Sequence, residues 1–339
     1  MQYQSPYQLK ELSMLSKSIS TLVFGCIGAL ALSVPGASAA AYPDKPIHMI
    51  VPFAPGGTAD IIGRLFASQL GKELGQSIVV ENKPGAGGSI GARFVADSAP
   101  DGYTLLLSSS STQGSNAAVY KKLTYDPVDD FTPITLIETV PGVLSVTKSF
   151  PAGDMAGLIK ELKAKPDAYS YASSGKGGLG NLAMELFKSI AGVNIMHVPY
   201  KGAGPAFTDV ISGQVQMIWE PITAELPFIR NGQLKPIAIA ARERSGELPD
   251  VPTFEEAGIA NYNAQAWNGL LGPKNMPAGV VKKLHEASVQ ALKDPDMARK
   301  LAQLGGTVVA STPEQFRKVI VDDIAKWKRV AADSNIQLD

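Results

Sequence analysis

Residues 52–60 read Pro-Phe-Ala-Pro-Gly-Gly-Thr-Ala-Asp and connect two segments of different character. The near-continuous apolar run at 47–51 predicts a strand buried on both faces, and the apolar spacing at 59–74 predicts a helix. The adjacent Gly56 and Gly57 allow the backbone to approach a ligand closely, because they carry no Cβ. The first amides of the helix lack intrahelical partners, so this turn predicts an anion-binding site.

A second glycine-rich turn follows the same plan. Residues 82–88 read Asn-Lys-Pro-Gly-Ala-Gly-Gly, after a predicted strand at 77–80 and before a predicted helix at 89–99. This turn again offers backbone N–H groups at the start of a helix. We therefore expect the two turns to form a pair of neutral cradles for a carboxylate.

The alternation of short apolar strands with helical patterns continues along the chain. Further strands are expected at 103–107, 144–147, 169–172, 195–198, 215–219 and 236–240, and further helices at 155–164, 179–191, 204–212 and 222–231. After residue 261 an extended stretch runs through Trp267 and Leu271, and three helical patterns follow, the last opened by a capping box at 312–315. Strand–helix units joined by short Gly/Pro turns predict an α/β fold with parallel sheets.

The strands form two series, and the C-terminal segment follows the second. We therefore expect two lobes joined by more than one crossing: residues 42–142 together with 263–339 as the first, and residues 143–262 as the second. In open α/β sheets, ligands bind at the carboxyl ends of the strands. The glycine turns and the serines of this chain fall at those ends.

The first 39 residues predict a secretory signal. Lys10 and Lys17 precede an uncharged apolar run of about 16 residues, shorter than the roughly 20 of a membrane-spanning helix. The segment 37–39, Ala-Ser-Ala, supplies a small-x-small cleavage pattern, and the alternative interpretation is an uncleaved membrane anchor. We expect export to the periplasm with cleavage near Ala39. The single cysteine, Cys26, lies within the signal, so the mature protein has none for a disulfide.

The composition argues against several classes of protein. Lys and Arg number 31 and Asp and Glu 31, with no basic stripe, so nothing points to nucleic acid. His48, His197 and His285 lie far apart in the sequence without the spacing of metal ligands. No segment after the N-terminal run is apolar enough to span a membrane. We expect no metal site, no cofactor and no nucleic-acid partner.

Two motifs carry competing interpretations. Residues 87–91 match the G-x-S-x-G of a hydrolase nucleophile elbow. Several residues separate Ser89 from its strand, however, and no histidine is tied to it, so a helix N-cap is the simpler interpretation. Residues 175–180 match G-x-G-x-x-G, but 198–201 lack the acid of a dinucleotide site. The segment 173–175, Ser-Ser-Gly, is then either a third cradle or a plain turn.

Two charged residues at strand ends also have open interpretations. Glu220 follows the strand at 215–219. It either receives a ligand amine or hydroxyl, or caps the helix that begins near Pro221. Lys201 either places its ammonium group near a bound anion or is simply solvated.

Several separated motifs together resemble one family. They are Ile-Val-Pro-Phe-Ala-Pro-Gly-Gly-Thr-Ala-Asp at 50–60, Glu-Asn-Lys-Pro-Gly-Ala-Gly-Gly at 81–88, Pro-Asp-Gly-Tyr-Thr-Leu-Leu at 100–106, Val-Pro-Tyr-Lys-Gly at 198–202, Leu-Pro-Asp-Val-Pro-Thr-Phe-Glu-Glu-Ala-Gly at 248–258 and Trp-Asn-Gly-Leu at 267–270. In this order, across residues 42–339, they resemble the Bug family of extracytoplasmic solute receptors, which serve tripartite tricarboxylate transporters.

The resemblance implies a two-lobe, type II periplasmic binding protein-like fold, each lobe a mostly parallel sheet flanked by helices. The lobes close over a small carboxylate, which loops like 53–60 and 84–88 grip with the help of ordered water. Residues of the second lobe read the distal group of the ligand. Glu220 stands where aspartate is common in the family, so the distal preference does not transfer. The predicted ligand-binding residues are Phe53, Gly56, Gly57, Thr58, Asp60, Gly85, Ala86, Gly87, Ser109, Ser110, Ser173, Ser174, Gly175, Lys201 and Glu220.

The function implied by the resemblance is capture and delivery of a solute. We expect a monomeric receptor, without enzymatic activity or catalytic residues, that hands its carboxylate to the membrane permease subunits of a tripartite tricarboxylate transporter. Two other classes remain as alternatives. One is a secreted serine hydrolase that uses Ser89, and the other is a ligand-sensing receptor for a signalling partner.

Overall fold

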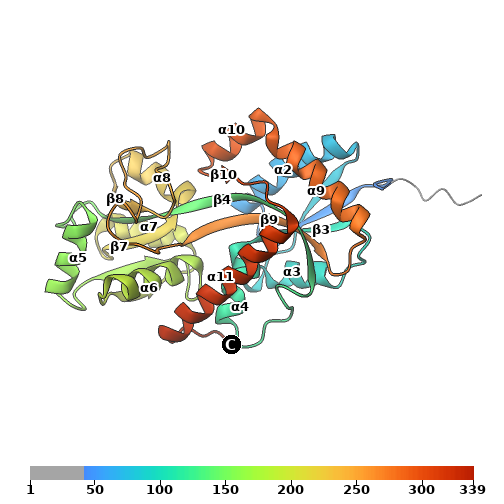
Figure 1. Ribbon diagram of the computed structural model, residues 1–339. Coiled ribbons are helices and arrows are strands. Elements are labelled where there is room, and N and C mark those ends of the chain that lie inside the picture. Colours follow the sequence, from blue (N-terminus) through green and yellow to red (C-terminus); the bar gives the residue numbers. More distant parts are fainter. Residues whose placement is uncertain (1–41) are drawn as a thin grey trace, which may run out of the picture. The chain divides into compact units, whose positions relative to one another are not determined.

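Strands from both ends and the middle of the chain join in one mixed sheet of ten strands, within the residues 42–339 that the computed structural model describes. The order is β2-β1-β3-β9-β4-β7-β5-β6, and β10 and β8 also pair with β4. Figure 1 shows helices packed around the long strands β4 and β9. The expected signal peptide, its cleavage site and Cys26 lie outside the described residues.

The strands and helices alternate along most of the chain. The strands are β1 (Ile47–Val51), β2 (Ile78–Asn82), β3 (Thr104–Ser109), β4 (Phe131–Thr147), β5 (Ser170–Ser173), β6 (Met196–Pro199), β7 (Met217–Pro221), β8 (Leu234–Ile239), β9 (Gln265–Pro273) and β10 (Thr307–Val308). The helices are α2 (Thr58–Leu74), α3 (Ser89–Ala96), α4 (Asn116–Val119), α5 (Met155–Ala164), α6 (Leu179–Ala191), α7 (Ala203–Ser212), α8 (Ile222–Arg230), α9 (Ala278–Lys293), α10 (Pro295–Gln303) and α11 (Pro313–Asp333), with a 3₁₀ turn η1 (Ala86–Gly88) and a π-helical turn η2 (Ser111–Ser115).

Strand β4 runs through both halves of the sheet. Its residues 131–141 pair antiparallel with β9, and its residues 142–147 pair antiparallel with β7 and β8. Because β9 is also antiparallel to β3, β4 runs in the same direction as β3 and its parallel neighbour β1. Strands β5 and β6 run parallel to β7, and therefore opposite to β4. The carboxyl ends of β1–β3 consequently face those of β5–β7.

A glycine allows the close approach of strands where the two halves meet. Gly142 of β4 pairs with Pro221 of β7. A Cβ on Gly142 would lie 1.8 Å from Cζ2 of Trp219, so no larger residue fits without moving the indole ring. The junction is therefore built for tight packing of the Trp219 ring against the β4 backbone.

Each half of the sheet has its own apolar core. One core contains Ile50, Leu106 and Phe316, and another contains Phe187 and Trp219. Burial of each such side chain contributes roughly 1.5–3 kcal/mol. Helix α11 reaches both cores, because its Phe316 belongs to the first and its Trp327 to the second. The C-terminal helix thus fastens the two halves together.

The predicted elements are largely confirmed. Helices α5 and α6 have the expected bounds, and α11 begins with the expected capping box. Strand β4 is much longer than the predicted 144–147 because Pro133 and Pro141 interrupt the strand signal. The turn η2 and the two-residue strand β10 were not predicted. No helix among the described residues is both long and apolar enough to cross a membrane.

Candidate functional site

Four helices begin at the facing strand ends with a glycine and no side-chain cap. They are α2 after β1, α3 after β2, α6 after β5 and α7 after β6, with N-caps Gly57, Gly88, Gly178 and Gly202. By contrast, Asp154, Asp294 and Thr312 cap α5, α10 and α11 with their side chains. Backbone N–H groups at the four glycine-led starts are not satisfied by a capping side chain, which is the arrangement that binds anions.

The first turn is held by a buried carboxylate. Asp60 accepts hydrogen bonds from the Gly56 amide at 2.9 Å, from Arg64 Nε at 3.1 Å and from Asn82 Nδ2 at 2.9 Å. The hydrogen bond from Arg64 is the largest of the influences that lower the pKa of Asp60 to about 2. Because both of its carboxylate oxygens are engaged, Asp60 holds the turn in place. Asn82 also donates to the Phe53 carbonyl at 3.0 Å.

The second turn has an unusual backbone. Gly85, Ala86, Gly87 and Gly88 all have positive φ, at 127°, 47°, 62° and 90°. Ala86 is the only one of the four with a Cβ, so it carries backbone strain on the order of 1–3 kcal/mol, of a kind that clusters at ligand sites. Asn116 Nδ2 donates to the Gly87 carbonyl at 2.9 Å and fixes the turn.

The two turns lie against each other. A Cβ on Gly88 would sit 3.4 Å from the ring atom Cζ of Phe53, which is half-buried between them. Gly57 itself has an ordinary extended backbone, with φ of −78°, and space for a Cβ, whose nearest neighbour would be the Ala54 carbonyl at 3.6 Å. Gly56, at φ of +82°, is the residue of this turn whose conformation favours glycine. Thr58, the first residue of α2, is exposed.

The end of β3 supplies two buried serines. Ser109 and Thr112 bond each other reciprocally: the Ser109 amide donates to Thr112 Oγ1 at 3.0 Å, and the Thr112 amide donates to Ser109 Oγ at 3.3 Å. The Ser110 hydroxyl makes no hydrogen bond within the described residues. The π-helical turn η2 follows directly, a form that is frequent at functional sites.

The second half contributes a loop from β5. Ser173 is fully buried, and its Oγ lies 2.7 Å from His197 Nε2 and 3.1 Å from the Gly175 carbonyl oxygen. Burial lowers the pKa of His197 to about 4, so the imidazole is neutral at pH 7. Ser173 therefore shapes the loop, and the following Ser174 and Gly175 are half-buried. Lys201 is exposed and has no ion pair within the described residues.

Glu220 is a buried acid at the end of β7. Its Oε1 accepts a hydrogen bond from the Ser174 amide at 3.2 Å. Burial raises the pKa of Glu220 to about 7. The neighbouring Glu225 accepts hydrogen bonds from the Glu220 amide and the Ser145 hydroxyl, and its burial raises its pKa well above the ordinary value. The strand end therefore carries two carboxyl groups that favour protonation.

The loop from β5 also touches the first half. A Cβ on Gly177 would lie 3.2 Å from Val119 of α4 and 3.0 Å from Leu338 near the C-terminus. The Gly177 amide is held by Asn181 Oδ1 at 2.9 Å. The structure thus brings the predicted residues into two groups, one around residues 53–60 and 85–87 and one around 173–175 and 220, at strand ends that face each other.

The structure gives no support to a hydrolase site at Ser89 or to a metal site among the described residues. Ser89 is the first residue of α3 rather than its N-cap, which is Gly88. Its hydroxyl accepts a hydrogen bond from Asn116 Nδ2 at 3.2 Å, and within residues 42–339 it has no hydrogen bond to a histidine. No group of three or more His, Cys, Asp or Glu side chains in that range could hold a metal ion.

Sequence reasoning missed the residues that support the loops, chiefly Asn82, Asn116, Thr112 and Asn181. Their partners are 22 to 29 positions away in two cases, so no local pattern reveals them. Asn82 stood inside the quoted turn motif, and its polar side chain at a strand end was the one available signal.

The fold and the facing helix N-termini define the class of periplasmic solute-binding proteins. A family model described as tripartite tricarboxylate transporter family receptor matches residues 62–336. The chain is 37% identical to Protein BugT of Bordetella pertussis over 302 residues, which is 89% of this chain and 93% of BugT. It therefore belongs to the tripartite tricarboxylate transporter receptor family, which includes the Bug proteins.

Two solved structures resemble the chain in fold and sequence. Rpa4515 of R. palustris, solved with adipate, is 34% identical with a TM-score of 0.77, and the match covers 87% of this chain and 99% of that one. MatC of Rhodopseudomonas palustris, solved with bound malate, is 35% identical with a TM-score of 0.73, and the match covers 85% and 99%.

Proposed function

We propose that this receptor binds a small organic dicarboxylate between the two halves of its sheet and delivers it unchanged to membrane permease subunits. The observation that carries the proposal is the set of four glycine-led helix starts, without side-chain caps, at strand ends that face each other. The adipate and malate of the two related structures support the choice of a dicarboxylate.

The proximal carboxylate binds to backbone amides of the two turns in the first half. Gly57 and Thr58 form one side of this grip, and Ala86 and Gly87 form the other. Asp60 and Asn116 hold the turns from behind through the hydrogen bonds to Gly56 and Gly87. Ser109 and Ser110 flank the carboxylate, and ordered water completes its coordination.

The strength of such a grip suits a receptor. A hydrogen bond to a charged group contributes roughly 1.5–3 kcal/mol. A complex with a micromolar Kd has a binding free energy of about 8 kcal/mol. Four such hydrogen bonds can supply it after the cost of ordering the ligand is subtracted. Neutral amides hold the anion without activating it for reaction, which agrees with a function in transport rather than catalysis.

The distal group of the ligand meets Ser174, Gly175 and Glu220. Because burial raises the pKa of Glu220 to about 7, a large fraction of this side chain is protonated near neutral pH and donates a hydrogen bond. The protonated Glu220 can donate a hydrogen bond to a second carboxylate or a hydroxyl group of the ligand, whereas an ionised Glu220 would repel a carboxylate. Lys201, exposed on the neighbouring loop, adds a favourable positive charge.

A ligand that bridges both halves favours their closed arrangement. In this proposal, residues 42–142 with 263–339 close on residues 143–262, and the closed monomer is the form that the permease subunits recognise. The protein acts after export and cleavage near Ala39.

Thermal-shift screening of the purified protein tests the proposal. We expect succinate, malate, glutarate or adipate to raise the melting temperature by several degrees, and the matching monocarboxylates, such as butyrate, to raise it much less. The stabilising acid, recovered after incubation, should be chemically unchanged. Equal stabilisation by monocarboxylates would contradict the role of Glu220, and conversion of the acid would contradict a transport receptor.

A further inference from the structure

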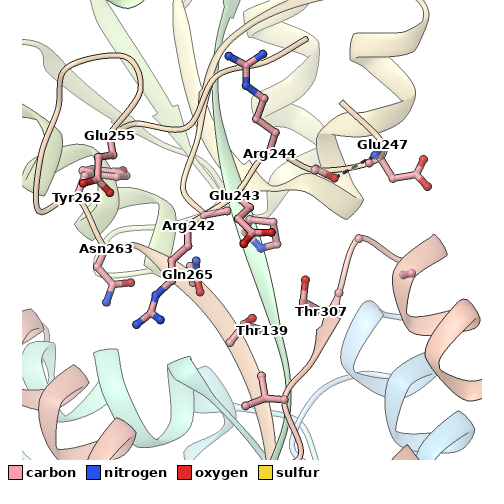
Figure 2. Close-up of a pocket in the computed structure, with 18 of the residues that line it drawn as sticks. Thr139, Arg242, Glu243, Arg244, Glu247, Glu255, Tyr262, Asn263, Gln265 and Thr307 are labelled. Carbon is pink, nitrogen blue, oxygen red and sulfur yellow. Dashed lines mark hydrogen bonds between the residues drawn. The ribbon is translucent and has the colours of Figure 1, made fainter. Parts of the chain in front are cut away.

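A groove of about 930 Å³ lies away from the predicted ligand-binding residues. Its walls come from β4, the loop 241–247 after β8, the segment 259–265 before β9 and the segment 302–309 around β10. None of the fifteen predicted ligand-binding residues lines it. Its volume falls in the range of small-molecule sites. Figure 2 shows the groove with its polar side chains.

The groove contains an arginine without a partner. Arg242 makes no hydrogen bond and no ion pair within residues 42–339. Arg244, two residues later, is paired with Glu256 at 2.9 Å and donates to the Pro249 carbonyl, and Glu247 is paired with Arg230. A guanidinium without an acidic partner is available to bind a carboxylate or phosphate, whose geometry its planar N–H groups match.

Neutral polar side chains accompany Arg242. Thr139, Gln265, Asn263 and Thr307 all line the groove, and none of these four side chains forms a hydrogen bond within residues 42–339. In Figure 2 the Arg242 side chain extends into the groove toward Gln265 and Thr139, with Asn263 on its other side. Hydroxyl and amide groups of this kind can donate to the oxygens of an anion.

The acidic residues of the groove lie elsewhere in it. Glu243 follows Arg242 in the chain, but its carboxylate points away from the Arg242 guanidinium, and Glu255 lies at the Tyr262 end (Figure 2). The Arg242 guanidinium therefore lies among neutral polar side chains, apart from these two carboxylates.

We infer that the groove is a second binding site, centred on Arg242, that takes a small oxyanion such as an organic carboxylate or phosphate. The anion binds the Arg242 guanidinium and accepts hydrogen bonds from Thr139 and Gln265. The site differs in kind from the carboxylate grip proposed above, which uses backbone amides and no arginine.

Occupancy of this site bears on the arrangement of the two halves. Thr307 of β10 pairs with Thr139 in the first half of the sheet, whereas Arg242 follows β8, which pairs with the second half of β4. An anion that joins Arg242 to Thr139 therefore bridges the halves and stabilises one arrangement of them over others.

Protection of Arg242 from phenylglyoxal, followed by mass spectrometry of its peptide, tests the inference. Sodium phosphate and sodium succinate are titrated separately at constant ionic strength. We expect one or both to slow the modification of Arg242 saturably, by at least fivefold. Arg329 is the control, because it is exposed on α11 and also has no partner within residues 42–339. The more protective anion identifies the ligand class.

Two variants separate this site from the grip between the halves. Thr139→Val keeps the shape and strand preference of Thr139 but removes its hydroxyl, so it should weaken the protection severalfold. Gly57→Val, which blocks the grip, should leave the protection intact. The inference is overturned if neither anion protects Arg242, if Arg329 is protected equally, if Thr139→Val changes nothing or if Gly57→Val abolishes the effect.

Discussion

The backbone amide of Ser174 donates a 3.2 Å hydrogen bond to the carboxyl group of Glu220. This contact ties the end of β5 to the end of β7, and it leaves one Glu220 oxygen to meet a ligand. Because burial raises the pKa of this group to about 7, its protonation state changes within the physiological range. The same contact therefore links the shape of the proposed site to pH.

Binding of a dicarboxylate should weaken at high pH because of Glu220. The protonated form donates to the distal carboxylate, so affinity is highest near pH 6, where the ligand is still ionised, and falls up to tenfold for each pH unit above 7. Glu220→Gln keeps a donor at all pH values and should flatten the profile between pH 6 and 9. Calorimetry at several pH values measures this, and an unchanged profile in the variant would assign the titration to another group.

Replacement of Gly57 by valine should abolish ligand binding while the protein stays folded. The backbone at Gly57 is extended, and a Cβ there has room in the protein itself, so only the approach of a ligand is blocked. We expect at least a hundredfold loss of affinity by calorimetry, with a melting temperature within a few degrees of the original. Gly153→Val is the matched control, since a Cβ at Gly153 meets nothing within 4 Å. If Gly57→Val bound the ligand as tightly as the original protein, the carboxylate would not bind at this turn.

Asn116 should matter through the turn that it holds. Asn116→Ala removes the hydrogen bonds to the Gly87 carbonyl and to Ser89, which costs on the order of 1 kcal/mol of stability and should lower affinity about tenfold. Asn116→Asp places a carboxylate beside the Gly87 carbonyl and should be worse for an anionic ligand. If both variants bound as tightly as the original protein, the 85–88 turn would need no support from Asn116.

The free energy of unfolding should decrease as pH rises, because of Glu138. This residue of β4 is fully buried, accepts a hydrogen bond from Asn268 Nδ2 at 3.1 Å, and has no hydrogen-bond partner for Oε2 within the described residues. Burial raises its pKa to about 7. The folded protein therefore binds more protons than the unfolded chain between about pH 4.5 and 7, and its stability decreases as pH rises through that window.

Glu138→Gln should remove this pH dependence. At pH 8 the variant should be more stable than the original by as much as about 3 kcal/mol, because the pKa of Glu138 is raised from 4.5 to about 7 and each unit corresponds to about 1.4 kcal/mol. Denaturant unfolding at pH 5 and pH 8 measures the difference. Glu73→Gln, on the exposed face of α2, removes a surface carboxylate and serves as control. A variant that loses stability equally at both pH values would show that Glu138 is ionised in the folded state.

The sequence reveals the alternating elements and the glycine turns well. The turn at 52–60 and the helices α5 and α6 follow from local patterns of apolar residues, glycines and caps. Strand β4 does not, because Pro133 and Pro141 obscure a strand whose stability comes from pairing with β9, β7 and β8. Its role in joining the two halves is a property of the tertiary structure.

In the proposed site too, some residues are predictable from local sequence and others are not. The glycines and serines at strand ends could be predicted because their chemistry is local. The supporting contacts could not: the motif at 52–60 does not show that the Asp60 oxygens accept hydrogen bonds from Gly56, Arg64 and Asn82. Likewise, nothing near Glu220 in the sequence indicates its burial or its raised pKa.

A crystal structure of the complex with the most stabilising dicarboxylate tests the central claim most directly. We predict one carboxylate within hydrogen-bond distance of the amides of Thr58 and Gly87, and the other end of the unaltered acid beside Glu220. A ligand bound elsewhere, with the amides of both turns left to solvent, would contradict the proposed grip.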